Sequence, residues 1–159
     1  MNFLKIIGAL LVSCSGVLVA YMLNGGERKA LRQLEGVLAF LRFLQINISA
    51  YSMPLPEILL RCPREIYTAC GYAKSEPPRT VKELFEECSF SDSSLRQSLL
   101  AFSSEIGKGY SREQLELLER TAEEIEEKRR RKSTALPSKV KSNAAVCISV
   151  SLSVVILLF

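Results

Sequence analysis

Hydrophobic, uncharged residues occupy both ends of this chain, at residues 6–23 and 143–159, and this distribution constrains the fold more than any other feature. All acidic residues, and all basic residues except Lys5, lie between the two runs. An α-helix rises about 1.5 Å per residue, so each run is long enough to cross most or all of a hydrocarbon layer about 30 Å thick. The sequence therefore predicts a polar central domain that is held to a membrane at both ends.

Each hydrophobic run has an alternative interpretation. The first resembles a secretory signal peptide, because Lys5 precedes it, but cleavage requires small residues three and one positions before the cut. Leu18 precedes Ala20 and Leu23 precedes Gly25 at that spacing, which favours a retained anchor. The second run could form a buried core helix. Its apolar residues leave no polar face beyond scattered serines, which favours a second membrane segment.

The sequence predicts four parts: an N-terminal transmembrane anchor at residues 1–24, a cytoplasmic helical domain at 25–136, a basic linker at 137–142 and a C-terminal transmembrane segment at 143–159. Basic residues cluster on the central side of both runs, whereas only Lys5 lies outside them. The positive-inside rule then places the central domain in the cytoplasm of a two-pass cell-membrane protein. The same clusters suit anionic lipid headgroups.

The central domain has the hydrophobic periodicity of helices. From residue 27 to about residue 50, apolar residues recur every three or four positions, which is typical of an amphipathic helix: Leu31, Leu34, Leu38, Leu41, Leu44 and Ile48. A shorter seam recurs at heptad spacing near residue 120: Leu115, Leu118, Ala122 and Ile125. It persists for under two heptads, so packing on the first helix is favoured over coiled-coil pairing.

Helix boundaries follow from local signals. Thr80 with Glu83, and Ser111 with Gln114, predict capping boxes, and Asp92 predicts another helix start. A left-handed stop is predicted at Gly107, a flexible joint at Gly25 and Gly26, and a break or kink at Pro137. No sustained strand alternation occurs outside the hydrophobic runs. The predicted fold is all-α: a small helical bundle domain flanked by N-terminal and C-terminal transmembrane helices.

Catalytic chemistry has little support in the sequence. The chain has no histidine, and the spacing of Cys62, Cys70 and Cys88 matches no zinc signature, so these residues are interpreted as free, buried thiols. No phosphate-binding glycine loop is present, and the basic clusters lack interleaved aromatic residues. We therefore expect no enzyme activity, cofactor, catalytic residue, metal site, small-molecule substrate or nucleic-acid partner.

Four sets of residues stand out beside the order of elements: residues 26–34 (GERKALRQL), Ile106-Gly107, Gln114 before a long charged helix, and the set Leu44, Ile48, Pro54 and Leu55. In these residues and in its order of elements the chain resembles the stage III sporulation protein AB family. The chain departs from the family at Asn47, where a glutamate is common, at Tyr110-Ser111, where an aspartate-arginine pair is common, and at Pro137.

This resemblance implies a non-catalytic platform component of the secretion-like channel between mother cell and forespore, with the domain on the mother-cell side. It implies a helical domain like those of type II secretion and type IV pilus platform proteins, with a cytosolic ATPase and other small membrane proteins as partners. The candidate partner surface comprises Arg28, Lys29, Arg32, Glu35 and Gln114. For the three basic residues, anchoring to anionic lipid is an equal alternative.

Two other functional classes remain open. The first is a membrane-tethered helical adaptor or signalling module unrelated to sporulation. The second is a small holin-like pore-forming protein, which the large share of the chain outside the hydrophobic runs disfavours.

Overall fold

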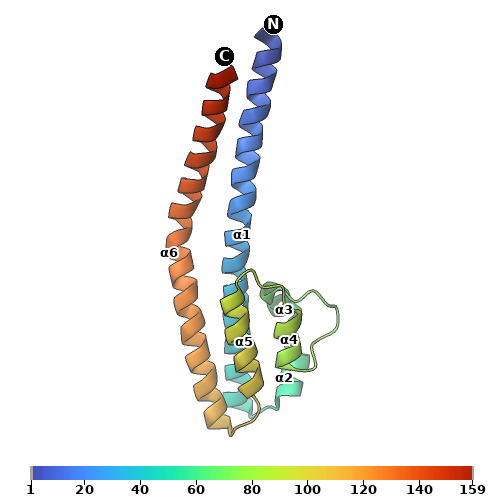
Figure 1. Ribbon diagram of the computed structural model, residues 1–159. Helices are drawn as coiled ribbons and strands as arrows, with labels where there is room; N and C mark the ends of the chain where they lie inside the picture. The colour runs from blue at the N-terminus through green and yellow to red at the C-terminus, as the bar shows by residue number, and fades with distance from the viewer. Residues whose placement is uncertain (1, 159) are drawn as a thin grey trace. The chain divides into compact units, whose positions relative to one another are not determined.

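The computed structural model describes the backbone of residues 2–158 and the side chains of residues 14–15, 18–19, 21–22, 25–150 and 153. Over residues 2–158 it contains six helices and no strand, which confirms the predicted all-α class (Figure 1). The helices are α1 (Asn2–Tyr51), α2 (Leu55–Arg61), α3 (Arg64–Cys70), α4 (Val81–Glu87), α5 (Ser93–Glu105) and α6 (Ser111–Leu158).

Flanking membrane helices were part of the predicted fold. Within the described residues, none of the helices has a stretch that is both long and apolar enough to cross a membrane. The segments predicted to do so, 6–23 and 143–159, extend beyond the residues whose side chains are described.

The chain forms two compact units, and α1 and α6 contribute residues to both. We call Lys29–Arg131 the core unit, and Met1–Arg28 together with Lys132–Phe159 the terminal unit. In the terminal unit, the Lys139 Nζ atom donates to Glu27 Oε1 at 2.9 Å, and Lys132 Nζ lies 3.9 Å from the other carboxylate oxygen. The hydrogen bond from Lys139 lowers the pKa of Glu27, so this carboxylate stays ionised near neutral pH.

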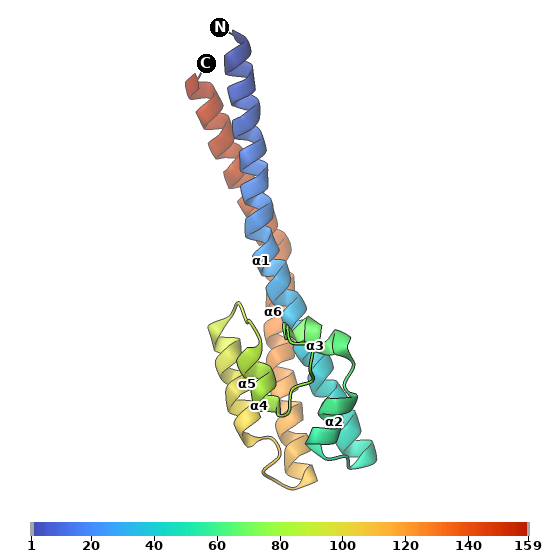
Figure 2. The same ribbon diagram turned by 90° about the vertical axis from the view of Figure 1, so that its right-hand side faces the viewer.

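The core unit is built around the α1 stripe predicted from the sequence. Four of its leucines and Ile48 are buried, and Leu31 is half-buried. The predicted seam of α6 joins the same hydrophobic core through Leu118 and Ile125. Figure 2 shows the short helices α2–α5 gathered around these two segments of α1 and α6.

Aromatic rings fill the centre of the core unit. The rings of Phe40 in α1 and Phe85 in α4 lie 5.8 Å apart and are perpendicular, an arrangement that aligns the positive edge of one ring with the negative face of the other. Phe102 of α5 and Tyr67 of α3 extend the cluster. The aromatic cluster thus links four helices that are distant in sequence.

Two of the three predicted helix starts are present. The Asp92 carboxylate accepts from the backbone N–H groups of Ser94 and Leu95 at the start of α5. The Thr80 hydroxyl accepts from Glu83 N at 3.0 Å, and the Glu83 carboxylate accepts from the backbone N–H of Arg79 at 2.8 Å. These contacts satisfy backbone donors that an isolated helix end leaves unpaired.

The start of α6 differs from the predicted Ser111–Gln114 capping box. Ser111 is the first helical residue, and the Glu113 carboxylate accepts from the backbone N–H of Tyr110 at 3.1 Å. The Gln114 side chain donates to the carbonyl of Gly109 at 2.7 Å. The helix is therefore capped one residue earlier than predicted, because the backbone N–H of Gln114 donates to the Tyr110 carbonyl at 3.0 Å and does not need the Ser111 hydroxyl.

The predicted joint and break are also absent from the described backbone. Helix α1 continues through Gly25 and Gly26, and α6 continues through Pro137 and through residues 137–142, which were predicted to be a linker. Glycine permits a helical backbone although it weakens it. An internal proline removes one hydrogen bond. Pro137 is exposed, so solvent can satisfy the carbonyl that loses its partner.

The predicted stop at Gly107 is confirmed. Its φ of 89° lies in the left-handed region, and α5 ends two residues before it. Glycine adopts this backbone conformation without the steric cost that a side chain would add.

Candidate functional site

The candidate surface predicted from the sequence is divided by the structure. Arg28, Lys29, Arg32 and Glu35 are exposed on successive turns of α1, as expected. Gln114 instead lies at the start of α6, where its amide binds the preceding loop. It lines a groove together with Ile48 of α1. At a rise of about 1.5 Å per residue, Ile48 lies about 24 Å from Arg32 along the axis of α1. The structure does not bring Gln114 to the other four residues.

Lys29 and Arg32 line a groove between α1 and α3 with a volume of about 560 Å³. Arg64, at the start of α3, adds a third basic side chain, and Glu65 is the only carboxylate that lines it among the described residues. All four side chains are exposed. We call this feature the basic groove. Its arrangement concentrates positive charge where an anionic group can enter.

A glycine lets α3 approach α1 beneath the basic groove. Lys29, Arg32 and Gly36 lie at spacings of three and four residues, so they share one face of α1. A Cβ atom at position 36 would come within 2.7 Å of the Ala69 carbonyl oxygen. The absence of a side chain at Gly36 therefore sets the separation of the helices that carry Arg32 and Arg64.

A buried amide fixes the loop beside the basic groove. The Gln33 side chain, which is 3% exposed, donates to the Ser89 carbonyl at 2.6 Å and accepts from the backbone N–H of Ser91 at 3.5 Å. These partners follow α4 by a few residues. One glutamine of α1 thus holds the connection between α4 and α5 by two hydrogen bonds, which is why a polar side chain is tolerated at a buried position.

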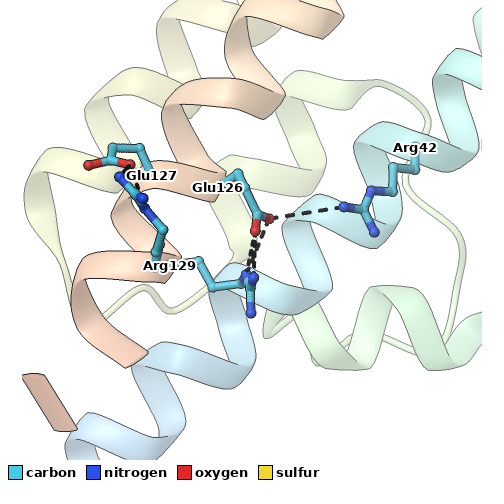
Figure 3. Close-up of polar contacts among 5 residues, drawn as sticks. Arg42, Glu126, Glu127 and Arg129 are labelled. Carbon is cyan, nitrogen blue, oxygen red and sulfur yellow. Dashed lines mark hydrogen bonds and ion pairs between the residues drawn. The ribbon is translucent and has the colours of Figure 1, made fainter. Parts of the chain in front are cut away.

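Glu35 faces α6 and not the basic groove. The hydrogen bond from Arg129 of α6 to Glu126 raises the pKa of Arg129, and the charge of Glu35 adds to this effect. Figure 3 shows the Glu126 carboxylate between Arg129 of its own helix and Arg42 of α1. The Arg42 Nη2 atom lies 4.0 Å from Glu126 Oε2, and both side chains are substantially exposed. An exposed pair of this kind contributes at most about 1 kcal/mol.

The acidic-then-basic run at residues 123–132 of α6 forms ion pairs within the helix. Lys128 pairs with Glu124 at 2.9 Å and Arg131 with Glu127 at 2.8 Å, both four residues apart. The hydrogen bond from Lys128 lowers the pKa of Glu124. These pairs neutralise part of the charge of this run within α6 itself.

The three central thiols are buried, as predicted. Desolvation raises the pKa of Cys62 to about 11 and that of Cys88 to about 12, and it raises the pKa of Cys70 as well. Nucleophilic cysteines require a lowered pKa and access to solvent, so this arrangement disfavours thiolate chemistry. The described residues contain no group of His, Cys, Asp and Glu placed to hold a metal ion.

Arg64 and Gly36 were missed by sequence reasoning. Arg64 follows a proline and reads as an ordinary residue of a short helix. Arg64 is also far from Arg32 in sequence, so the sequence does not show that the two side chains line one groove. The sequence does contain one indication of the role of Gly36. A glycine inside an amphipathic helix lowers the stability of the helix, so its presence there suggests that another segment packs closely against it.

Comparisons with known proteins identify the family. The family model described as stage III sporulation protein AB matches residues 5–159. No curated protein and no solved structure matches the chain. The match extends over the core unit, the basic groove and nearly all of the terminal unit, and the chain belongs to the stage III sporulation protein AB family.

Proposed function

We propose that this chain is a non-catalytic, membrane-tethered scaffold of the sporulation complex between mother cell and forespore, and that its basic groove binds an acidic surface of a cytosolic ATPase. The observation that carries the proposal is the convergence of Lys29, Arg32 and Arg64 from two helices on one groove. Convergent cations steer an anionic partner and fix its register. The core unit faces the mother-cell cytoplasm in this proposal.

Membrane attachment is supported by the terminal unit. Large apolar side chains are exposed on both of its described segments: Leu18, Val19, Tyr21, Met22, Val146, Ile148 and Val150. Tyr21 and Met22 are 75% and 69% exposed. Apolar surface of this kind is unfavourable in water and is expected where lipid or another apolar helix covers it. Attachment at both ends restricts the core unit to the membrane surface and raises its effective concentration for partners there.

A scaffold role requires binding and no reacting group. The raised pKa values of the buried cysteines support this view, because these thiols stay protonated at physiological pH. Among the residues that line the basic groove, the hydroxyl of Thr68 donates to the Arg64 carbonyl of its own helix, and the one carboxylate, that of Glu65, is exposed. The groove is therefore suited to electrostatic recognition.

Charge reversal tests the proposed docking site. The double variant Arg32→Glu/Arg64→Glu of the full-length chain in lipid nanodiscs should bind the ATPase of the complex at least about tenfold more weakly, because attraction is lost and like charges are opposed. Arg42→Glu/Arg112→Glu changes the net charge equally on residues outside the groove and should leave the affinity within about threefold. Unchanged affinity of the groove variant would refute ATPase binding at the basic groove.

Lipid anchoring is separated by a second measurement. Nanodiscs that contain only neutral lipid remove anionic headgroups, so wild-type affinity for the ATPase should persist in them. Loss of ATPase binding in neutral nanodiscs would instead assign the basic groove to lipid.

A deletion strain tests the cellular role. Vegetative growth should be normal, and spore development should stop after engulfment begins. Normal sporulation of the deletion strain would contradict the proposed scaffold role.

A further inference from the structure

A larger groove, with a volume of about 770 Å³, lies where the start of α2, the start of α4 and the end of α5 meet. Its floor is apolar: Ile48, Leu59, Val81 and Ile106 are buried, and Leu55 is half-buried. We call this feature the apolar groove. Its volume is within the range of sites that enclose several apolar groups of a ligand, about 300–1,000 Å³.

The rim of the apolar groove is basic. Arg79, Lys82 and Lys108 line it and are exposed, and no aspartate or glutamate is among its lining residues. Lys82 lies 3.7 Å from Glu86. Within the described part of the chain, the side chains of Arg79 and Lys108 form no ion pair, so two cations remain available to a partner.

We propose that the apolar groove binds a short, acidic, amphipathic peptide segment of a partner protein. Apolar side chains of the segment cover the floor, and carboxylates pair with Arg79 and Lys108. This matches the usual anatomy of a protein interface, with a dry apolar centre and a polar rim. The sign of the rim charge excludes a basic segment, because like charges across an interface cost affinity.

The apolar groove is separate from the basic groove. Ile48 and Arg32 are on the same helix with about 24 Å between them along its axis. The two grooves share no lining residue, so a short peptide bound at the apolar groove leaves the residues of the basic groove available. The inference does not depend on binding of an ATPase at the basic groove.

Peptide selection tests both the site and the chemistry. A displayed library of random 12-residue peptides is selected on the full-length chain in lipid nanodiscs. A parallel selection uses Ser104→Trp, which places a bulky ring at an exposed position that lines the apolar groove. The hydroxyl of Ser104 bonds only within its own helix, to the Ala101 carbonyl, so the core should be unaffected. Equal thermal unfolding temperatures of the two proteins verify this.

The expected result is a set of peptides that bind the wild-type chain and not Ser104→Trp, with leucine-like residues next to aspartate or glutamate. One such peptide should lose at least about tenfold in affinity for Arg79→Glu/Lys108→Glu. Its affinity should stay within about threefold for Arg96→Glu/Arg120→Glu, which makes the same change in net charge outside the groove. Because the Arg79→Glu/Lys108→Glu variant changes only charge, it tests the site even if the tryptophan of Ser104→Trp disturbs the fold.

Three outcomes would overturn the proposal. The first is a failure to select peptides that distinguish wild type from Ser104→Trp. The second is a selected set that is basic, or that binds Arg79→Glu/Lys108→Glu equally well. The third is self-association of the wild-type chain that Ser104→Trp abolishes, measured by analytical ultracentrifugation, because the occupant would then be a second copy of this chain.

Discussion

Gly36 of α1 is packed so closely against Ala69 of α3 that a Cβ atom at position 36 would lie 2.4 Å from the Ala69 carbonyl carbon. The other near atoms, the Ala69 oxygen and Cys70 nitrogen, are also backbone atoms. Backbone atoms within a helix cannot rotate away as a flexible side chain can. Any side chain at position 36 therefore forces α1 and α3 apart and opens the core between them.

Replacement of Gly36 by alanine should reduce the free energy of unfolding. Overpacking costs about 1–3 kcal/mol and exceeds the gain of about 1 kcal/mol in helix propensity. Urea unfolding followed by circular dichroism measures the difference. Gly26→Ala is the matched control, because nothing lies within 4 Å of a Cβ atom there. It should leave stability unchanged or higher, and equal stability of the two variants would contradict the close packing.

Removal of the Gln33 amide should also destabilise the core unit. Gln33→Leu keeps the approximate size of the side chain but leaves the Ser89 carbonyl without its 2.6 Å donor. The expected loss is about 1 kcal/mol, near the lower end for an unsatisfied group, because Ser89 is exposed and can turn to water. Gln97→Leu, at an exposed position of α5, should stay within about 0.5 kcal/mol. Equal unfolding midpoints for the two variants would show that Gln33 does not hold the loop.

The helices of the core unit could be predicted because their signals are local. The α1 leucines repeat at helical spacing, and Asp92 stands directly before a helix, where its carboxylate accepts from the first backbone N–H groups. At the start of α6, Ser111 fits the capping pattern, but the helix is capped one residue earlier, where the Glu113 carboxylate accepts from the backbone N–H of Tyr110. The local sequence pattern alone does not decide which of two adjacent residues caps the helix.

The basic groove could be predicted only in part. Lys29 and Arg32 are visible as exposed cations on one helix, whereas Arg64 joins them only through the contact of α1 with α3. That contact depends on Gly36 and on the core beneath it, which are tertiary features. The separation of Gln114 from the other four candidate residues could not be predicted for the same reason, because nothing local shows which end of α1 its helix start meets.

The buried thiols predict a loss of stability at alkaline pH. Burial raises the pKa of Cys62 to about 11 and that of Cys88 to about 12, whereas an unfolded thiol ionises near about 8.5. Between these values the unfolded chain has released protons that the folded chain still holds, so the free energy of unfolding falls as pH rises. Urea unfolding at intervals from pH 8 to 10 should show this decline.

A variant isolates the contribution of one thiol. Cys88→Ala should have a shallower dependence on pH, whatever its stability at pH 8, because one titrating group contributes at most about 1.36 kcal/mol per pH unit. An unfolding free energy that stays constant from pH 8 to 10 in the wild-type chain would contradict burial of the thiols.

The burial of Cys62, Cys70 and Cys88 also determines how membrane orientation should be measured. These thiols react slowly in the folded chain, so their protection from a maleimide says nothing about the side of the membrane. Ser75→Cys places a thiol at an exposed position of the α3–α4 loop. The positive-inside rule predicts that an impermeant maleimide adds no label to Ser75→Cys in intact cells and labels it after permeabilisation, relative to the unmodified chain. Asn2→Cys provides the reciprocal control and should be labelled without permeabilisation. If Ser75→Cys is labelled in intact cells and Asn2→Cys is not, the core unit lies outside the cytoplasm, where a cytosolic ATPase could not reach the basic groove.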